Sequence, residues 1–250
     1  MSLTHNNVTI DFFDDFEEMP TQILISISGG LDSASLAYLI CTHYPDIELI
    51  PYCCKVVDQP FDALCAIDIV QWLIERFPDN NINELDVYDV DDLDPQGLID
   101  CAAILKENAD NGTPMGYRSP RGLLKTVLID KVTIALTNKY PGVLRCSGMT
   151  ANPPIDEMKR LGFYEIAERR RDRGEGIDDI DTLSFCKMYQ PFLNVDKKFI
   201  ADIYKTHGLL DSLVPLTSSC VGVREETDYF TKPCETCFWC NEKLWAFGHL

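Results

Sequence analysis

The chain has 250 residues, of which 46% are hydrophobic and 10% aromatic, and its formal net charge is −18. A chain of this size can bury a core as one large domain, or as one domain with an appendage. Its negative charge disfavours stable nucleic-acid binding, because such binding depends mostly on neutralising phosphates. No stretch approaches the roughly 18 apolar residues of a membrane span, and no signal-peptide pattern opens the chain. We therefore expect a cytoplasmic protein with no membrane partner.

Strands and helices alternate along most of the sequence after an acidic lead-in whose structure we do not assign. The hydrophobic patterns predict strands at 23–27, 48–57, 82–90, 143–147 and 188–192. They predict helices at 32–44, 61–77, 95–108, 122–140, 156–173 and 196–207, with a loop at 174–182. This alternation indicates an α/β protein with a doubly wound, mostly parallel sheet. In such sheets ligands bind beyond the carboxyl ends of the strands.

The same patterns suggest how the chain is divided. We interpret residues 1–20 as an N-terminal lead-in, 21–215 as a nucleotide-binding domain and 216–250 as a cysteine-containing segment. We find no internal repeat, low-complexity tract or long linker between them.

The turn after the first apolar strand reads Ser28, Gly29, Gly30, Leu31, Asp32, Ser33. Glycine lets the backbone approach a ligand closely, and the first N–H groups of the following helix lack partners and attract an anion. The two serines add hydroxyl groups, so the turn is typical of a phosphate-binding loop. It lacks the lysine and the spacing of the Walker-type loop. The alternative is an ordinary strand–turn–helix corner with a serine cap.

The cysteines divide into two groups. Eleven cysteines without a secretion signal indicate a reducing compartment, and hence thiols or metal ligands rather than disulfides. Five of them lie within apolar patterns and are expected to pack in the core: Cys41, Cys53, Cys54, Cys65 and Cys101.

The other notable group lies near the end of the sequence. Cys234, Cys237 and Cys240 form a CxxCxxC motif, and Cys220 lies fourteen residues upstream of it. Four thiolates without a nearby histidine are typical of a closed structural zinc site. The same spacing also suits ligation of a [4Fe–4S] cluster, which remains the main alternative. Four packed, reduced cysteines in this polar loop are less favoured.

A basic segment interrupts the acidic sequence. Arg169, Arg170, Arg171 and Arg173 follow Lys159 and Arg160. We interpret them as one solvated helix face, balanced by neighbouring acidic residues. The alternative is a mobile basic segment over the phosphates of a nucleotide.

The loop resembles the SGGxDS motif of the PP-loop ATP pyrophosphatases. Together with the cysteine motif, it makes residues 22–240 similar to the 7-cyano-7-deazaguanine synthase family. Four further segments are similar to that family's VPxRN, TGxNxxD, TPL…K..I and T-x-S-C patterns: residues 117–122, 147–152, 191–200 and 217–220.

The resemblance implies a reaction and a set of ligands. Such enzymes use ATP to adenylate 7-carboxy-7-deazaguanine and release pyrophosphate. Ammonia then displaces AMP to form an amide, and a second adenylation gives the nitrile. Mg²⁺ would share the phosphate charge near Asp32, and Zn²⁺ would play a structural role at the four cysteines. A homodimer is expected from the family.

Three basic residues are candidates for the same site. We expect Lys197 to act as a cation on the phosphates, with Arg121 and Lys125 on the substrate or phosphate side. Together with Asp32, Lys197 and Arg121 form the predicted catalytic set. For each of the three basic residues, a solvated surface position is the alternative.

The sequence also departs from the family. Residues 52–55 replace its YGQ-R/K-H pattern, and residues 153–158 replace its YPDCRxEF segment. The segments that would bind ATP and metal therefore match the family better than those that would recognise the deazapurine base. The identity of the acyl substrate is thus not fixed by the sequence. One alternative function is a PP-loop tRNA thiolase that uses Cys146 or Cys186 as its catalytic cysteine. Another is a zinc-stabilised binding module with an inactive nucleotide site, against which the intact loop argues.

Overall fold

The computed structural model describes residues 1–5, 8–14, 16–56, 61–89, 94–111, 120–162, 180–182, 187–222 and 224–249. Within them lies a six-stranded sheet in the order β5-β4-β3-β6-β8-β7. Its strands are β3 (Gln22–Ser26), β4 (Glu48–Lys55), β5 (Asp86–Asp89), β6 (Leu144–Cys146), β7 (Ile180–Thr182) and β8 (Lys187–Tyr189). All pairings are parallel except that of the edge strand β7 with β8. The predicted mostly parallel sheet is confirmed.

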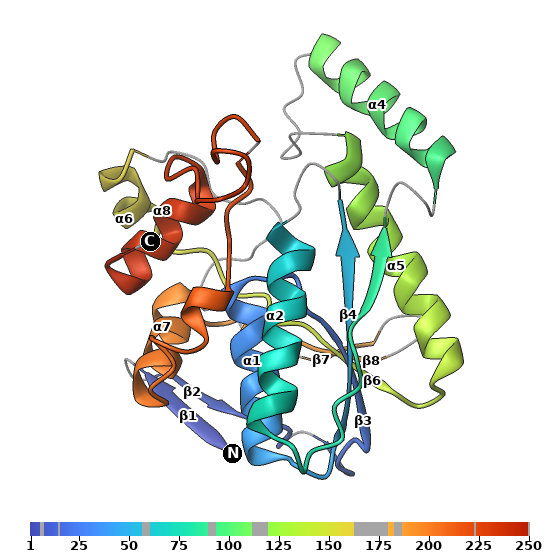
Figure 1. Ribbon diagram of the computed structural model, residues 1–250, viewed down its shortest axis with the longest axis vertical. Coiled ribbons are helices and arrows are strands. Elements are labelled where there is room, and N and C mark those ends of the chain that lie inside the picture. The colour runs from blue at the N-terminus through green and yellow to red at the C-terminus, as the bar shows by residue number, and fades with distance from the viewer. Residues whose placement is uncertain are drawn as a thin grey trace.

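Helices cover both faces of this sheet (Figure 1). The described helices are α1 (Leu31–His43), α2 (Phe61–Arg76), α4 (Pro95–Asp110), α5 (Pro120–Lys139), α6 (Ile155–Arg160), α7 (Lys197–Thr206) and α8 (Phe238–Phe247), with a short 3₁₀ helix at Val214–Leu216. Among the described helices, none is both long enough and apolar enough to cross a membrane.

The central strand β3 shows why the fold is doubly wound. Ile23 and Ile25 pack with α1, α2 and α7 on one face, whereas Leu24 packs with α5 on the other. Successive side chains of a strand point to opposite faces, so an uninterrupted apolar run needs cover on both sides. The helices α1 and α5 supply that cover.

The acidic lead-in forms an antiparallel hairpin of β1 (Ser2–His5) and β2 (Val8–Asp11). Phe12 and Phe13 follow it and are buried. The Phe13 ring lies 4.9 Å from that of Tyr189, and the Phe12 ring lies 6.1 Å from that of Phe192. Aromatic packing therefore fastens the N-terminal hairpin to the segment at the end of β8.

Several predicted boundaries are wrong. The third strand begins at Asp86 instead of residue 82, where only an isolated bridge to Leu49 forms. The last parallel strand ends at Tyr189, because the chain turns at the proline that follows shortly after it. Within the predicted loop 174–182, residues 180–182 form β7, which pairs with β8 although it is too short to show a strand pattern.

The predicted helix 156–173 is also shorter where it is described. It ends at Arg160, because the N–H groups of residues 161 and 162 bond to carbonyls only three residues back and close the last turn. Residues 163–179, with the four arginines, lie outside the described part. The predicted domain division stays a prediction.

Glu157 joins three helices. Its carboxylate accepts hydrogen bonds from Lys198 Nζ of α7, at 2.9 Å, and from Trp245 Nε1 of α8. The Lys198 ammonium also lies 4.3 Å from the Trp245 ring centroid. These hydrogen bonds lower the pKa of Glu157 below its ordinary value of 4.5.

We expect Glu157→Gln to lower the melting temperature at neutral pH by about 2 °C, because the partly exposed carboxylate loses two charge-assisted hydrogen bonds. A lowered folded pKa stabilises the fold above pH 4.5, and this contribution is lost as the pH falls through the lowered value. The difference from wild type should therefore shrink in thermal melts below pH 4.5. Asp156→Asn, at a carboxylate 84% exposed, is the control. A difference that does not change with pH would contradict the role of the charge.

Candidate functional site

The loop between β3 and α1 lies where the direction of the sheet's connections reverses. The chain crosses from β3 to β4 on one side, whereas β6 pairs with β3 on the other. In doubly wound proteins, a crevice opens at this switch point beyond the carboxyl ends of the strands. The topology therefore places residues 28–33 and the segment after β6 at the position where such folds bind ligands.

The conformation of the loop leaves the start of α1 without a side-chain cap. Gly30 is the N-cap residue. The Ser33 hydroxyl donates to the Gly30 carbonyl at 3.2 Å, and the Ser28 N–H donates to Ser33 Oγ at 3.3 Å. The serines thus hold the turn in shape and do not cap the helix N–H groups. The alternative of an ordinary strand–turn–helix corner requires such a serine cap. An uncapped helix start of this kind can bind an anion.

Neighbouring backbone closes tightly around the loop. Gly29 has φ +75°, and a Cβ there would lie 2.7 Å from the Asp62 carbonyl oxygen. A Cβ on Gly148, after β6, would lie 2.7 Å from the Asp32 carbonyl oxygen. On a third side, the Ser218 N–H donates to the Gly29 carbonyl at 2.9 Å. Packing from α2, from the segment after β6 and from the segment before Cys220 therefore fixes the loop.

Lys197 meets the loop from α7. Its ammonium lies 2.5 Å from Asp32 Oδ2 and 3.9 Å from Glu242 Oε2. The lysine side chain is only 3% exposed, that of Glu242 is 0% exposed and that of Asp32 is 23% exposed. The structure thus brings the predicted Asp32 and Lys197 together, with a second carboxylate that the sequence analysis missed.

Asp32 retains an unused oxygen. Its Oδ1 is buried and has no hydrogen-bond partner among the described residues. Nearby, the Tyr204 hydroxyl donates to the Leu31 carbonyl at 3.0 Å, and burial together with the Asp32 charge raises the Tyr204 pKa well above its usual value. A buried carboxylate oxygen without a partner is a candidate ligand for a divalent cation that accompanies a phosphate.

The other two basic candidates are Lys125 and Arg121. Lys125 has a carboxylate partner in place of the expected substrate or phosphate position, and the side chain of Arg121 is not described. Lys125 of α5 forms an ion pair with Asp62 of α2, and both side chains are 16% exposed. Burial lowers the Lys125 pKa, but the attraction of Asp62 outweighs this effect and leaves the pKa raised. Lys125 therefore steadies α2, whose Asp62 carbonyl abuts Gly29, and it is not a solvated lysine. Arg121 lies in the first turn of α5, and its side chain is outside the described part.

The four terminal cysteines converge. The Sγ atoms of Cys220, Cys234, Cys237 and Cys240 all lie within 4.8 Å of one another, and all four residues are buried. The backbone N–H groups of residues 222, 234, 237 and 240 each donate to one of these sulfurs, at 3.2–3.4 Å. Hydrogen bonds from Cys220 and Cys240 lower the pKa of Cys237. Four thiols with such N–H support can hold a metal as thiolates.

The remaining described cysteines pack, as predicted. Burial raises the pKa of Cys41 and of Cys53 to about 12 and that of Cys54 to about 11. Cys65 is half-buried beside Gly29, and burial raises its pKa to about 11. Cys146 is 0% exposed and its pKa is likewise raised by burial. Such thiols are poor nucleophiles.

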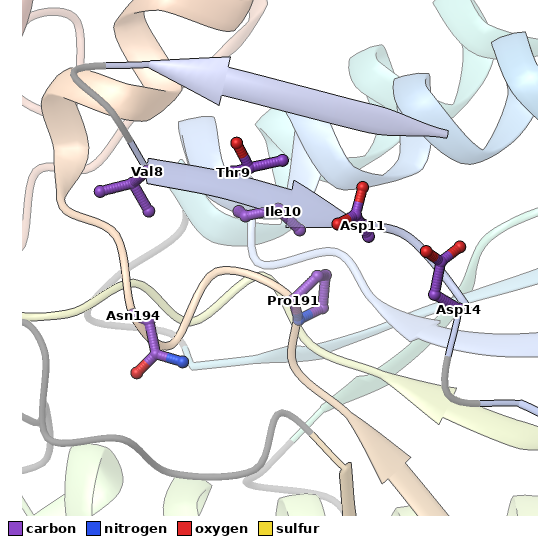
Figure 2. A pocket seen from close by; sticks show the side chains of 7 residues that line it. All are labelled: Val8, Thr9, Ile10, Asp11, Asp14, Pro191 and Asn194. Atoms are coloured by element: carbon purple, nitrogen blue, oxygen red, sulfur yellow. The ribbon is translucent and has the colours of Figure 1, made fainter.

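A cavity of about 360 Å³ lies elsewhere, between β2 and the turn after β8 (Figure 2). Asp11 and Asp14 line it together with Asn194, and none of its described lining residues is a lysine or arginine. None of the loop residues 28–33 lines it either. Its two carboxylates would repel a phosphate or a carboxylate, so we do not regard it as the site of an anionic ligand.

Two charged residues of α8 escaped the sequence analysis. Glu242 is buried in the middle of the helix, and Lys243 is half-buried. Burial lowers the pKa of Lys243, and the nearby Lys197 ammonium adds to that effect. The sequence does contain a signal that Glu242 is buried. It lies three residues before Trp245 and four before Ala246, so it shares a helix face with these apolar residues.

No protein-family model matches the chain, and no curated protein matches it in sequence. Among solved structures, it is similar to an NMN synthetase from Francisella tularensis, with 13% identity, a TM-score of 0.48 and coverage of 92% of this chain and 79% of that chain. It is also similar to a U34-tRNA thiolase from Methanococcus maripaludis that has a [4Fe-4S] cluster, with 16% identity, a TM-score of 0.45 and coverage of 94% and 72%.

A third similar structure is a glutamine-dependent NAD+ synthetase from Acinetobacter baumannii, with 12% identity and a TM-score of 0.44. That alignment covers 80% of this chain but only 32% of the synthetase. Similarity at this level is too low to assign a reaction to this chain.

We expect Gly29→Ala to destabilise the protein more than Gly142→Ala. Both glycines have positive φ, at +75° and +84°, but only at Gly29 does the added Cβ meet backbone. The left-handed conformation costs about 1–2 kcal/mol at either position. The contact with Asp62 should add roughly 1–3 kcal/mol at Gly29. Urea unfolding of the two variants measures this difference, and equal losses would contradict the close packing of the loop.

We expect Cys237→Ser to reduce both the bound metal and the melting temperature, because the cluster loses one of its four sulfur ligands. Metal content by mass spectrometry and thermal melts of the purified protein provide the measurement. Cys101→Ser, at a buried cysteine outside the cluster, should leave the metal content unchanged. A Cys237→Ser protein with normal melting temperature would contradict a structural role.

Proposed function

We propose that the chain is an ATP-dependent carbon–nitrogen ligase that adenylates a carboxylate, releases pyrophosphate and AMP, and transfers the acyl group to ammonia. The observation that carries this proposal is the uncapped, glycine-bearing loop at the switch point, with the Lys197–Asp32 pair against it. It agrees with the resemblance of residues 28–33 to the SGGxDS motif of the PP-loop ATP pyrophosphatases.

The loop residues would bind the two outer phosphates of ATP. The first N–H groups of α1 and the hydroxyl of Ser28 are the available donors, while the Ser33 hydroxyl, which donates to the Gly30 carbonyl, holds the turn in shape. Lys197 would neutralise negative charge that moves onto the departing pyrophosphate, and its burial makes that charge more effective than at the surface. Mg²⁺, when bound with ATP, would share the same charge, and the free Oδ1 of Asp32 would hold it.

The proposed chemistry takes place at one carboxyl group, which is first adenylated, then converted to an amide, and finally adenylated a second time to give a nitrile. A carboxylate oxygen attacks the α-phosphorus, the bond to the β-phosphate breaks, and pyrophosphate leaves an acyl-adenylate behind. Ammonia then attacks the acyl carbon, loses a proton and expels AMP, which gives an amide. Adenylation of the amide oxygen by a second ATP, followed by loss of AMP and the two amide protons, gives a nitrile. The protein's part is to position these groups and to stabilise charge.

For the acyl substrate we propose 7-carboxy-7-deazaguanine or a related deazapurine, which makes 7-cyano-7-deazaguanine the product if both adenylations occur. The support is the resemblance of the chain to the family that carries out this conversion. Arg121, in the first turn of α5, is proposed to assist on the substrate side.

For the cysteine cluster we propose one structural Zn²⁺. A tetrahedral ion with Zn–S bonds of about 2.3 Å places its sulfurs about 3.8 Å apart. The four sulfurs here lie within 4.8 Å of one another, and Cys234 and Cys240 are 4.0 Å apart. In a [4Fe–4S] cluster each cysteine binds a different iron, so the sulfurs stand farther apart. The compact arrangement supports a single ion.

The thiolase alternative has less support. Its proposed cysteine, Cys146, is fully buried in β6 with a raised pKa, so it is a poor nucleophile. Cys186 lies outside the described residues. A binding module with an inactive nucleotide site does not explain why a lysine and two carboxylates are held together at the loop.

Incubation of the protein with ATP, Mg²⁺, ammonium and a panel of carboxylates tests the proposal. We expect AMP and pyrophosphate to form in equal amounts with 7-carboxy-7-deazaguanine or a close relative. Asp32→Ala should reduce AMP formation by about 100-fold or more, because it removes the carboxylate proposed to hold Mg²⁺ at the reacting phosphates. Asp46→Ala, at an exposed carboxylate, is the control and should keep full activity. Release of ADP and phosphate, or full activity of Asp32→Ala, would overturn the proposal.

A further inference from the structure

We propose that Glu242 is a positioning residue: it holds the Lys197 ammonium at the phosphate loop and so links the cysteine cluster to nucleotide binding. This inference rests on the proposed function and deepens it. It gives a role to Glu242, a residue that belongs neither to the loop motif nor to the cysteine motif.

The burial of Glu242 requires an explanation. A carboxylate that is 0% exposed loses its hydration, which is costly unless a cation or hydrogen bonds compensate for it. Lys197 Nζ lies 3.9 Å from its Oε2, and Lys197 is itself 3% exposed. A buried ion pair adds little stability compared with apolar packing. Its placement beside the loop therefore points to function.

Two carboxylates from different elements face one ammonium. Asp32 of α1 lies 2.5 Å from Lys197 Nζ, and Glu242 of α8 approaches the same nitrogen. Binding of ATP with a divalent cation would engage Asp32 in other interactions. Glu242 sits on a different helix and does not depend on that change, so it would keep Lys197 oriented while Asp32 serves the ligand.

The cysteine cluster fixes where Glu242 lies. Cys237 is the N-cap of α8, and its sulfur accepts the N–H of Cys240 at 3.4 Å. Glu242 follows only two residues after Cys240. Because two of the four sulfurs lie at the start of this helix, an intact cluster would help to fix its register. The cluster would thereby determine the position of a charged group at the nucleotide site.

A double-mutant cycle tests this inference. The probe is α,β-methylene-ATP with Mg²⁺, whose binding is measured by calorimetry and requires no knowledge of the acyl substrate. The variants are Glu242→Gln, Lys197→Met and the double substitution. The matched control is Glu235→Gln, which removes the same charge from an exposed residue between Cys234 and Cys237.

We expect Glu242→Gln to weaken binding of the analogue by about tenfold, which is less than the loss of a direct buried charge contact, because Glu242 does not itself touch the ligand. In the Lys197→Met background the same substitution should have almost no further effect, because Glu242 acts through that lysine. Glu235→Gln should bind like wild type. In turnover assays with the substrate found by the screen, Glu242→Gln should lower kcat as well as raise the KM for ATP.

Three results would overturn the inference. The first is wild-type affinity for the analogue in Glu242→Gln, and the second is a double variant in which the fold-losses of affinity of the two single variants multiply. The third is a loss of affinity that the loss of bound metal explains entirely. Metal content and melting temperature are therefore measured for every variant. If Glu242→Gln fails to retain its metal, Glu242→Asp, which keeps the charge near the cluster, takes its place in the cycle. Failure of the wild type to bind the analogue would instead contradict the proposed function itself.

Discussion

The arrangement of the site depends on the buried contact between Lys197 and Asp32. It joins the first turn of α7 to the first turn of α1, 165 residues apart in the sequence. Removing one partner of such a pair costs about 3–5 kcal/mol, because the other charge remains buried without compensation. Replacing both by apolar residues can cost nothing, so stability alone does not account for the pair. Its value lies in a positive charge held in a fixed place beside an uncapped helix start.

The cysteine cluster connects to this contact by two routes. On one side, the Ser218 N–H donates to the Gly29 carbonyl, and Ser218 Oγ accepts a hydrogen bond from the N–H of Cys220, the first cysteine of the cluster. On the other side, α8 begins at Cys237 and brings Glu242 to Lys197. The segment that carries the cysteines can thus support the loop of residues 28–33 from both directions. Metal binding, which supplies folding energy to such segments, would then also set the geometry of the proposed nucleotide site.

Parts of the fold and of the site were predictable from local patterns. The apolar run of β3, the helical periodicity of α1 and α5, and the loop between β3 and α1 each carry their signal within about 20 residues. The spacing of Cys234, Cys237 and Cys240 indicates convergence because three ligands in seven residues can reach one point. Short edge strands were not predictable in this way. Three residues of β7 carry no alternation, and only pairing with β8 makes them a strand.

The sequence by itself determined the class of fold, the position of the loop and which four cysteines converge, because these depend on residues close together in the chain. Tertiary structure alone decided that Lys125 pairs with Asp62, that Lys197 reaches Asp32 and that Glu242 is buried beside it. A charged residue in a helix looks the same in sequence whether it faces water or a partner. Its role is settled by the helix that packs against it, and that packing arises from apolar contacts spread over the whole chain.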